Sequence, residues 1–189
     1  MRSSLLPALA CAVALIGGCA STPQDNGGAG ATVGGYGGIL LVPLGGDRPE
    51  AGATVQIAHL MAEAVGGRRY TAMVYNFDGD YEVGVEDAAE TLAEEVAVAG
   101  TVNRIHAARL IESLGISHLL VIEAFAHDQR WDGTTKVTRV GVAAWLVDLR
   151  AGEIWEGRFE DEGKGLYKGY DYVEKVVVDR LASAIPPRM

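Results

Sequence analysis

Two long apolar segments in the second half of the chain, residues 117–128 and 136–149, constrain the fold most. SHLLVIEAFAHD is almost continuously apolar, and KVTRVGVAAWLVDL follows it with nearly the same character. Runs of this kind, rich in β-branched residues and bounded by polar turns, predict buried strands. Residues 154–161 then alternate, with Trp155 and Phe159 on one side and charged residues on the other. This alternation predicts a hairpin strand with one face in water.

The first half predicts the helices that cover these strands. The apolar run GILLVPL (38–44) and the run RRYTAMVYNF (68–77) predict two further strands, and residues 127–136 are predicted as a polar loop. Helices are predicted from apolar residues at spacings of three and four closed by glycine or proline, including one over 170–185. For the third helix, the expected cap is Thr101 and the expected inward positions are Ile105, Ala108, Ile111 and Leu114. The order β-α-β-α-α-β-β-β-α predicts an α/β fold, a single mixed β-sheet sandwich with helices packed on it.

The N-terminal residues predict export and a lipid anchor. Arg2 precedes LLPALACAVALIGG, which is long enough for the apolar part of a secretory signal and too short to span a bilayer. Ile16, Gly17 and Gly18 before Cys19 resemble the bacterial lipobox, in which the cysteine receives a diacylglycerol and the chain is cut before it. The resemblance implies a signal peptide over 1–18 and membrane attachment through N-terminal acyl chains on Cys19. The alternative is an ordinary secretory signal.

The residues after Cys19 predict a tether followed by one domain. Ala20, rather than Asp, follows the cysteine, which by analogy with enteric lipoproteins implies the outer membrane, with the domain facing the periplasm. The stretch to residue 38 is rich in glycine and lacks the Lys-Ser/Thr of a phosphate-binding loop, so a flexible tether is predicted. The predicted organisation is a lipoprotein signal peptide (1–18), lipidated Cys and Gly-rich tether (19–38), and a single periplasmic α/β domain (39–189).

Composition excludes several classes of chemistry. The only other thiol is Cys11, inside the predicted signal, so disulfides and thiolate catalysis are excluded from the domain. The net charge of −9 at pH 7, with no basic stripe, argues against nucleic-acid binding. The four histidines share no metal-ligand spacing, and no serine lies in a nucleophile elbow. The sequence therefore predicts no catalytic residue, no metal site and no cofactor.

One acidic loop offers the main alternative. Four side chains take positions one, three, five and twelve of a calcium-binding loop: Asn76, Asp78, Asp80 and Asp87. Tyr81 replaces the glycine that such a loop requires at position six, so a solvated loop is predicted. The row Glu86, Glu90 and Glu94 is likewise predicted to be a solvated helix face. A small periplasmic hydrolase or ligand-binding protein using the 76–87 loop is the alternative function.

A set of structural motifs carries a family resemblance. The motifs are Leu114-Gly115, the aliphatic run Leu119 to Ile122, Val147-Asp148 with Gly152, and Trp155. They resemble bacterial envelope lipoproteins of the curli-secretion lipoprotein, penicillin-binding-protein-activator lipoprotein and Tol β-propeller N-terminal domain group. The resemblance implies the same α/β domain. The chain departs from the group after Leu-Gly, where Ile116-Ser117-His118 replaces the usual Ala-Asp.

Without catalytic groups, the predicted function is a non-enzymatic, membrane-tethered docking or assembly module of the cell envelope. The partner is expected to be another envelope protein, and the composition is compatible with a homo-oligomer. Trp131 and its neighbour Arg130 are the candidate partner contacts, because they belong to residue types enriched at interface hot spots. The alternative for Trp131 is a lid folded over the end of the sheet.

Overall fold

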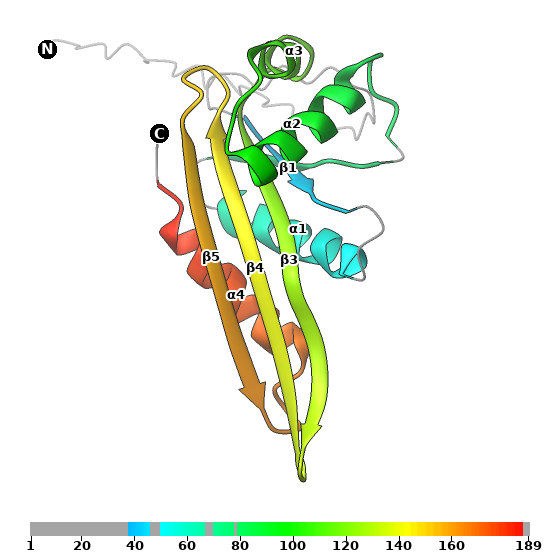
Figure 1. Cartoon of the computed structure of the whole chain (residues 1–189), viewed down its shortest axis with the longest axis vertical. Coiled ribbons are helices and arrows are strands. Elements are labelled where there is room, and N and C mark those ends of the chain that lie inside the picture. Colours follow the sequence, from blue (N-terminus) through cyan, green and yellow to red (C-terminus); the bar gives the residue numbers. More distant parts are fainter. Residues whose placement is uncertain (1–37, 46–49, 67–69, 78, 187–189) are drawn as a thin grey trace, which may run out of the picture.

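The computed structural model describes residues 38–45, 50–66, 70–77 and 79–186 (Figure 1). Cys19 and the predicted tether lie outside the described residues, apart from Gly38, which begins the first strand.

A five-stranded mixed sheet organises the domain. Its strands are β1 (Gly38–Pro43), β2 (Thr71–Val74), β3 (Ile116–Asp132), β4 (Thr135–Asp148) and β5 (Ile154–Lys164). They lie in the order β2-β1-β3-β4-β5, with β1 parallel to both of its neighbours and the last two pairings antiparallel. The two parallel pairings require crossovers, and the helices provide them.

Two helices cover each face of the sheet. On one face, the α1/α4 face, α1 (Ala51–Gly66) and α4 (Tyr170–Ala184) pack side by side. On the other, the α2/α3 face, α2 (Val85–Ala99) and α3 (Arg104–Leu114) lie over β1 and the beginning of β3 (Figure 1). The single mixed sheet, the helices packed on it and the element order are confirmed.

Successive side chains of the central strands point alternately into the two cores. In β1, Ile39 and Leu41 belong to the core under α1 and α4, whereas Leu40 and Val42 belong to the core under α2 and α3. Residues 119–122 of β3 divide between the two cores in the same way. Because neighbouring side chains of a strand point to opposite faces, a strand covered on both sides has a continuous apolar sequence.

The register of α3 differs from the expected one. Its buried residues are Ala107 and Leu110, while Ile105 is 79% exposed. Ala107, Leu110, Ile111 and Leu114 also follow helical spacing, so the apolar pattern contains two overlapping stripes and spacing alone could not choose between them. The cap is Asn103, not Thr101, because its side chain accepts a hydrogen bond from the Ile105 amide at 3.0 Å.

The predicted loop 127–136 is wrong: only residues 133–134 form a turn, and the others are strand. β3 and β4 continue as a hairpin to Asp132 and Thr135, joined by a tight turn in which Gly133 has φ 62°. We call the lower part of the three antiparallel strands the hairpin extension; it comprises 126–132, 135–141 and 160–164 (Figure 1). A helix covers only one face of this part of the sheet, so the strands here contain many polar residues, and such a sequence resembles that of a loop.

Phe125 marks the upper limit of the hairpin extension. The pairing of β3 with β4 shifts register between Ala124 and Ala126, a bulge that leaves Phe125 unpaired. The Phe125 ring lies over Gly141, where any Cβ would overlap it, and the Arg158 guanidinium lies 3.7 Å from the ring centroid. Beyond this stack the α2/α3 face changes from apolar to charged.

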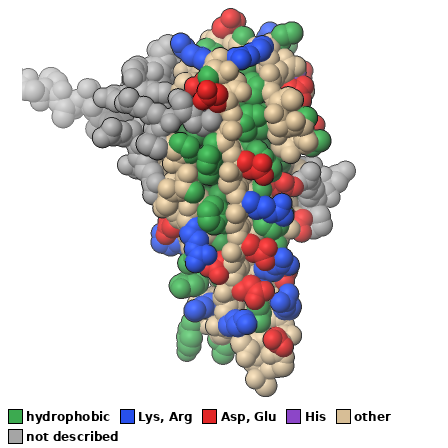
Figure 2. All heavy atoms as spheres, turned by 60° about the vertical axis from the view of Figure 1, so that its left-hand side comes forward, with side chains coloured by type: hydrophobic (Ala, Val, Ile, Leu, Met, Phe, Trp, Pro, Cys, Tyr) green, Lys and Arg blue, Asp and Glu red, His purple; other side chains and the backbone are tan. Residues whose placement is uncertain are grey.

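Ion pairs line the hairpin extension on the α2/α3 face. Arg139 donates to Glu160 at 2.5 Å and Arg130 to Glu162 at 3.2 Å. The hydrogen bond from Arg139 lowers the pKa of Glu160 below its usual value. Figure 2 shows acidic and basic side chains interspersed down the lower part of the molecule. These exposed pairs make the uncovered sheet face soluble and contribute little to stability.

On the α1/α4 face, a polar network centred on a buried carboxylate attaches α4 to the sheet. The Glu174 carboxylate is 1% exposed, lies 2.8 Å from the His127 Nε2, and accepts a hydrogen bond from the Gln56 side chain at 3.0 Å. The His127 ring also stacks on Tyr170 with ring centroids 3.9 Å apart. One carboxylate therefore joins β3, α1 and α4, and both of its oxygens have a hydrogen-bond partner.

Candidate functional site

The structure separates the two predicted contact residues. Trp131 and Arg130 are neighbours on β3, so their side chains point to opposite faces of the sheet. The Arg130 guanidinium lies on the charged face in its ion pair with Glu162. Trp131 lies on the α1/α4 face, close to the hairpin turn, and is 64% exposed. The two residues do not form one patch, and Trp131 is not a buried lid.

Other exposed apolar residues lie at the same end of the molecule as Trp131. After β5, Gly165 donates its amide to the Lys136 carbonyl at 2.9 Å, and Lys136 is the register partner of Trp131. The chain then turns into α4, and this turn exposes large side chains. Together with Trp131 they form the surface that we call the tip patch: Trp131 (64% exposed), Leu166 (73%), Tyr167 (98%) and Tyr172 (51%).

The tip patch combines aromatic surface with nearby cations. Lys168 lies in the same turn, with its ammonium 5.4 Å from the centroid of the Tyr172 ring. Tyrosine and tryptophan offer large contact areas at a low cost in side-chain entropy, and they dominate interface energetics. Sequence reasoning missed Leu166, Tyr167 and Tyr172, although the stretch GKGLYKGYDY, with large side chains between glycines, was a usable signal.

The acidic loop is organised by aromatic residues. Tyr81 stacks on Tyr75 with centroids 5.1 Å apart, and its hydroxyl accepts a hydrogen bond from the Asn76 amide at 3.0 Å. Asp80 and Asp87 are exposed, and Asp78 lies outside the described residues. Over the described part of the chain, no group of three or more His, Cys, Asp or Glu side chains is arranged to hold a metal ion. Tyr81, which replaces the glycine of a calcium-binding loop, makes the contacts that organise this loop.

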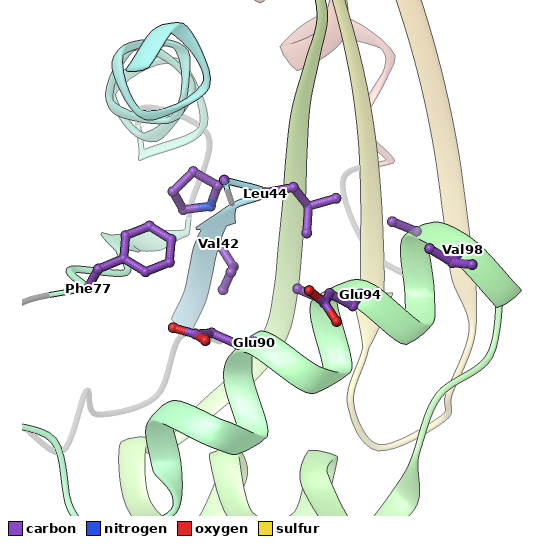
Figure 3. Close-up of a pocket in the computed structure, with 10 residues that line it drawn as sticks. Val42, Leu44, Phe77, Glu90, Glu94 and Val98 are labelled. Carbon is purple, nitrogen blue, oxygen red and sulfur yellow. The ribbon is translucent and has the colours of Figure 1, made fainter. Parts of the chain in front are cut away.

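The predicted row of solvated glutamates is only partly correct. Glu86 and Glu94 are exposed, but Glu90 is half-buried and accepts a hydrogen bond from the Tyr75 hydroxyl at 3.3 Å. Glu90 and Glu94 line a pocket of about 480 Å³ beside the end of β1 (Figure 3). Sequence reasoning could not find this pocket, because its walls come from three separate segments of the chain.

His118 and His127 have different surroundings, as expected from their separation along β3. The Nδ1 of His118 lies 2.8 Å from the Ser117 hydroxyl, and its Nε2 is buried with no hydrogen-bond partner in the described structure. Burial lowers the pKa of His118, and the nearby Asp148 carboxylate opposes this shift.

Comparison with known proteins finds likeness in fold alone. No protein-family model matches the chain, and no curated protein sequence matches it. PelC from Paraburkholderia phytofirmans, solved as a dodecamer, matches with 14% identity and a TM-score of 0.51 over 83% of this chain and 90% of that one. The Neisseria meningitidis lipoprotein GNA1162 matches with 20% identity and a TM-score of 0.49 over 78% and 99%. This chain therefore shares the fold of PelC, and its narrower resemblance to the curli, activator and Tol group stays a prediction.

No helix within the described ranges is long and apolar enough to cross a membrane.

Proposed function

We propose that this chain is a non-enzymatic, lipid-anchored module of the bacterial cell envelope that docks another envelope protein through its tip patch. The observation that carries the proposal is the gathering, at one end of the domain, of four of the eight large apolar side chains that are exposed in the described residues: Trp131, Leu166, Tyr167 and Tyr172. Each of these side chains is at least half exposed. Placing such side chains in water has no benefit for folding, whereas burying them against a partner is favourable.

The proposed anchor is Cys19, modified by acyl chains and followed by a tether of about twenty residues. At about 5–6 Å times the square root of its length, such a tether lets the domain stand some 25 Å from the membrane. We propose the outer membrane and a periplasm-facing domain, on the basis of the lipobox residues and Ala20. Gly38, where the proposed tether joins the domain, pairs with Ile116 at the beginning of β3, so the tip patch lies at the end of the domain away from the proposed anchor.

The proposed partner presents an apolar depression for the aromatic side chains. A second copy of the chain is one candidate, since the PelC structure that shares this fold is a dodecamer. We accordingly propose that the protein can form a homo-oligomer. Light scattering on the purified domain tests this, and a monomer at all concentrations would contradict it.

The docking experiment uses the tagged, lipidated protein to capture partners from detergent-solubilised envelopes. Trp131→Ala should abolish capture of a partner that wild type retains, because truncating a central aromatic contact typically costs about 2 kcal/mol or more. Ile105→Ala is the matched control, because Ile105 is also exposed but lies on α3 at the opposite end (Figure 1). Equal loss with both variants, or none with Trp131→Ala, would contradict the proposal.

A separate experiment tests the anchor. Cys19→Ser should move the protein from the membrane fraction to the soluble fraction and prevent incorporation of labelled palmitate. The proposed anchor would be wrong if Cys19→Ser stayed in the membrane fraction and the wild-type protein took up no palmitate. That result would not bear on the tip patch, which the capture experiment tests separately.

A further inference from the structure

A second surface, distant from the tip patch, has the shape and charge of a binding site. The pocket of about 480 Å³ falls within the range of small-molecule sites. It lies where the parallel strands β1 and β2 end, so that Leu44 follows one strand and Phe77 the other (Figure 3). The crevice beyond the carboxyl ends of parallel strands is a recurrent ligand position in α/β sheets.

Most of the pocket wall is apolar. Strand β1 and the residues after it form one side, α2 forms another, and Phe77 closes a third (Figure 3). The lining residues are Val42, Pro43, Leu44, Gly45, Phe77, Glu90, Ala93, Glu94, Ala97 and Val98. Phe77 is 42% exposed, although its ring packs edge-on against Tyr75 with centroids 5.1 Å apart. An apolar ligand would therefore cover aromatic surface that is already held in place.

The polar groups of the pocket all carry the same charge. Glu90 and Glu94 lie one turn apart on α2, and no lysine or arginine is among the lining residues. Two carboxylates at this spacing repel each other in the free protein. The Tyr75 hydroxyl donates a hydrogen bond to the Glu90 carboxylate and orients it. The pKa of Tyr75 is raised, first by burial and second by the nearby charge of Glu90. The hydroxyl therefore keeps its proton and remains a donor.

We propose that this pocket binds an apolar organic cation, with its hydrocarbon or aromatic body between Leu44, Phe77 and Ala97 and its ammonium or guanidinium group between Glu90 and Glu94. The cation would relieve the repulsion between the carboxylates while the apolar walls lose contact with water. The chain's own tether is a poor occupant, because residues 19–38 contain no lysine or arginine. The site is independent of the tip patch and of the proposed anchor.

The test uses three probes of one chain length: octylamine, 1-octanol and octanoate. Binding to the full chain is measured by calorimetry and by NMR saturation transfer at an ionic strength of about 0.15 M. Octylamine should bind about tenfold more tightly than 1-octanol, and octanoate should not bind. Equal binding of amine and alcohol would overturn the proposal, because the site would then select only for apolar character.

Variants locate the site. The double variant Glu90→Gln, Glu94→Gln should weaken octylamine about tenfold and leave 1-octanol unchanged. Glu86→Gln is the matched control, because Glu86 lies on the same helix outside the pocket lining and carries the same charge. Ala97→Phe should fill the pocket and remove binding of both probes, with circular dichroism showing that the variant is folded. Two results would show that the cation binds elsewhere. One is that Ala97→Phe binds octylamine as tightly as wild type, and the other is that Glu86→Gln weakens octylamine binding as much as the double variant does.

Discussion

The upper and lower parts of the sheet differ in what covers them. In the upper part, Leu120 and Val121 of β3 are fully buried, one beneath α1 and α4 and the other beneath α2 and α3. In the hairpin extension, α4 covers one face, while the other carries the pairs of Arg139 with Glu160 and Arg130 with Glu162. One strand, β3, passes through both environments, and its sequence changes from mostly apolar to mostly polar as it does so.

The difference shows how a single strand can combine stability with exposure. Burial on two faces fixes β3 at its beginning, so its far end does not need a second helix. The free end of β3 carries the exposed Trp131, which we propose as a docking residue rather than a core residue. The predictions below test this division, beginning with the contact that attaches α4 to the hairpin extension.

The largest effect is expected from Glu174→Ala. The substitution removes the carboxylate that joins His127 and Gln56 and leaves both polar side chains without their buried partner. Removing the partner of a buried or half-buried polar group typically costs about 1–3 kcal/mol for each group, and two groups lose their partner here. Urea unfolding should show this loss. The exposed Glu156→Ala on β5 is the control and should cost little, so equal effects of the two variants would contradict the attaching role of Glu174.

A smaller effect is expected at the junction of the two parts. Gly141→Val should cost about 1–3 kcal/mol, because its side chain would overlap the Phe125 ring that Arg158 covers. In a Phe125→Ala background the same change should be almost neutral, which a double-mutant cycle would measure. An equal cost in both backgrounds would show that the glycine is required for another reason.

A pH-dependent effect is expected in the upper part. Because burial lowers the pKa of His118, the unfolded chain takes up a proton at a higher pH than the folded one. The contribution of His118 is present above its unfolded pKa near 6.5 and is lost as the pH falls through its lower folded value. His118→Gln should therefore make the free energy of unfolding fall less steeply between neutral pH and pH 5. An unchanged slope in His118→Gln would contradict this expectation.

The sequence was sufficient to predict the order of the elements, because continuous apolar runs and helical stripes report burial directly. It was insufficient for α3, where two stripes overlap, and for the hairpin extension, whose alternating polar residues resemble a loop. The strand conformation of the hairpin extension depends on backbone pairing with its neighbouring strands and on contact with α4, and these are interactions between distant residues.

The candidate site was predictable only in part. An isolated tryptophan in a polar stretch predicts an exposed side chain, and Trp131 is 64% exposed; its role as a contact stays a prediction. The sequence alone could not place Arg130 relative to Trp131, because the strand conformation directs neighbouring side chains to opposite faces. The pocket beside Glu90 depends on how α2 meets the ends of β1 and β2, which no local pattern contains.

The most direct test of the account is the free energy of unfolding of Trp131→Ala, measured by urea denaturation against wild type. If the tip patch is a contact surface separate from the core, the change should stay within about 0.5 kcal/mol, the usual range for a surface substitution. A loss of about 3 kcal/mol or more, as for a buried aromatic residue, would make Trp131 part of the core and contradict the central claim.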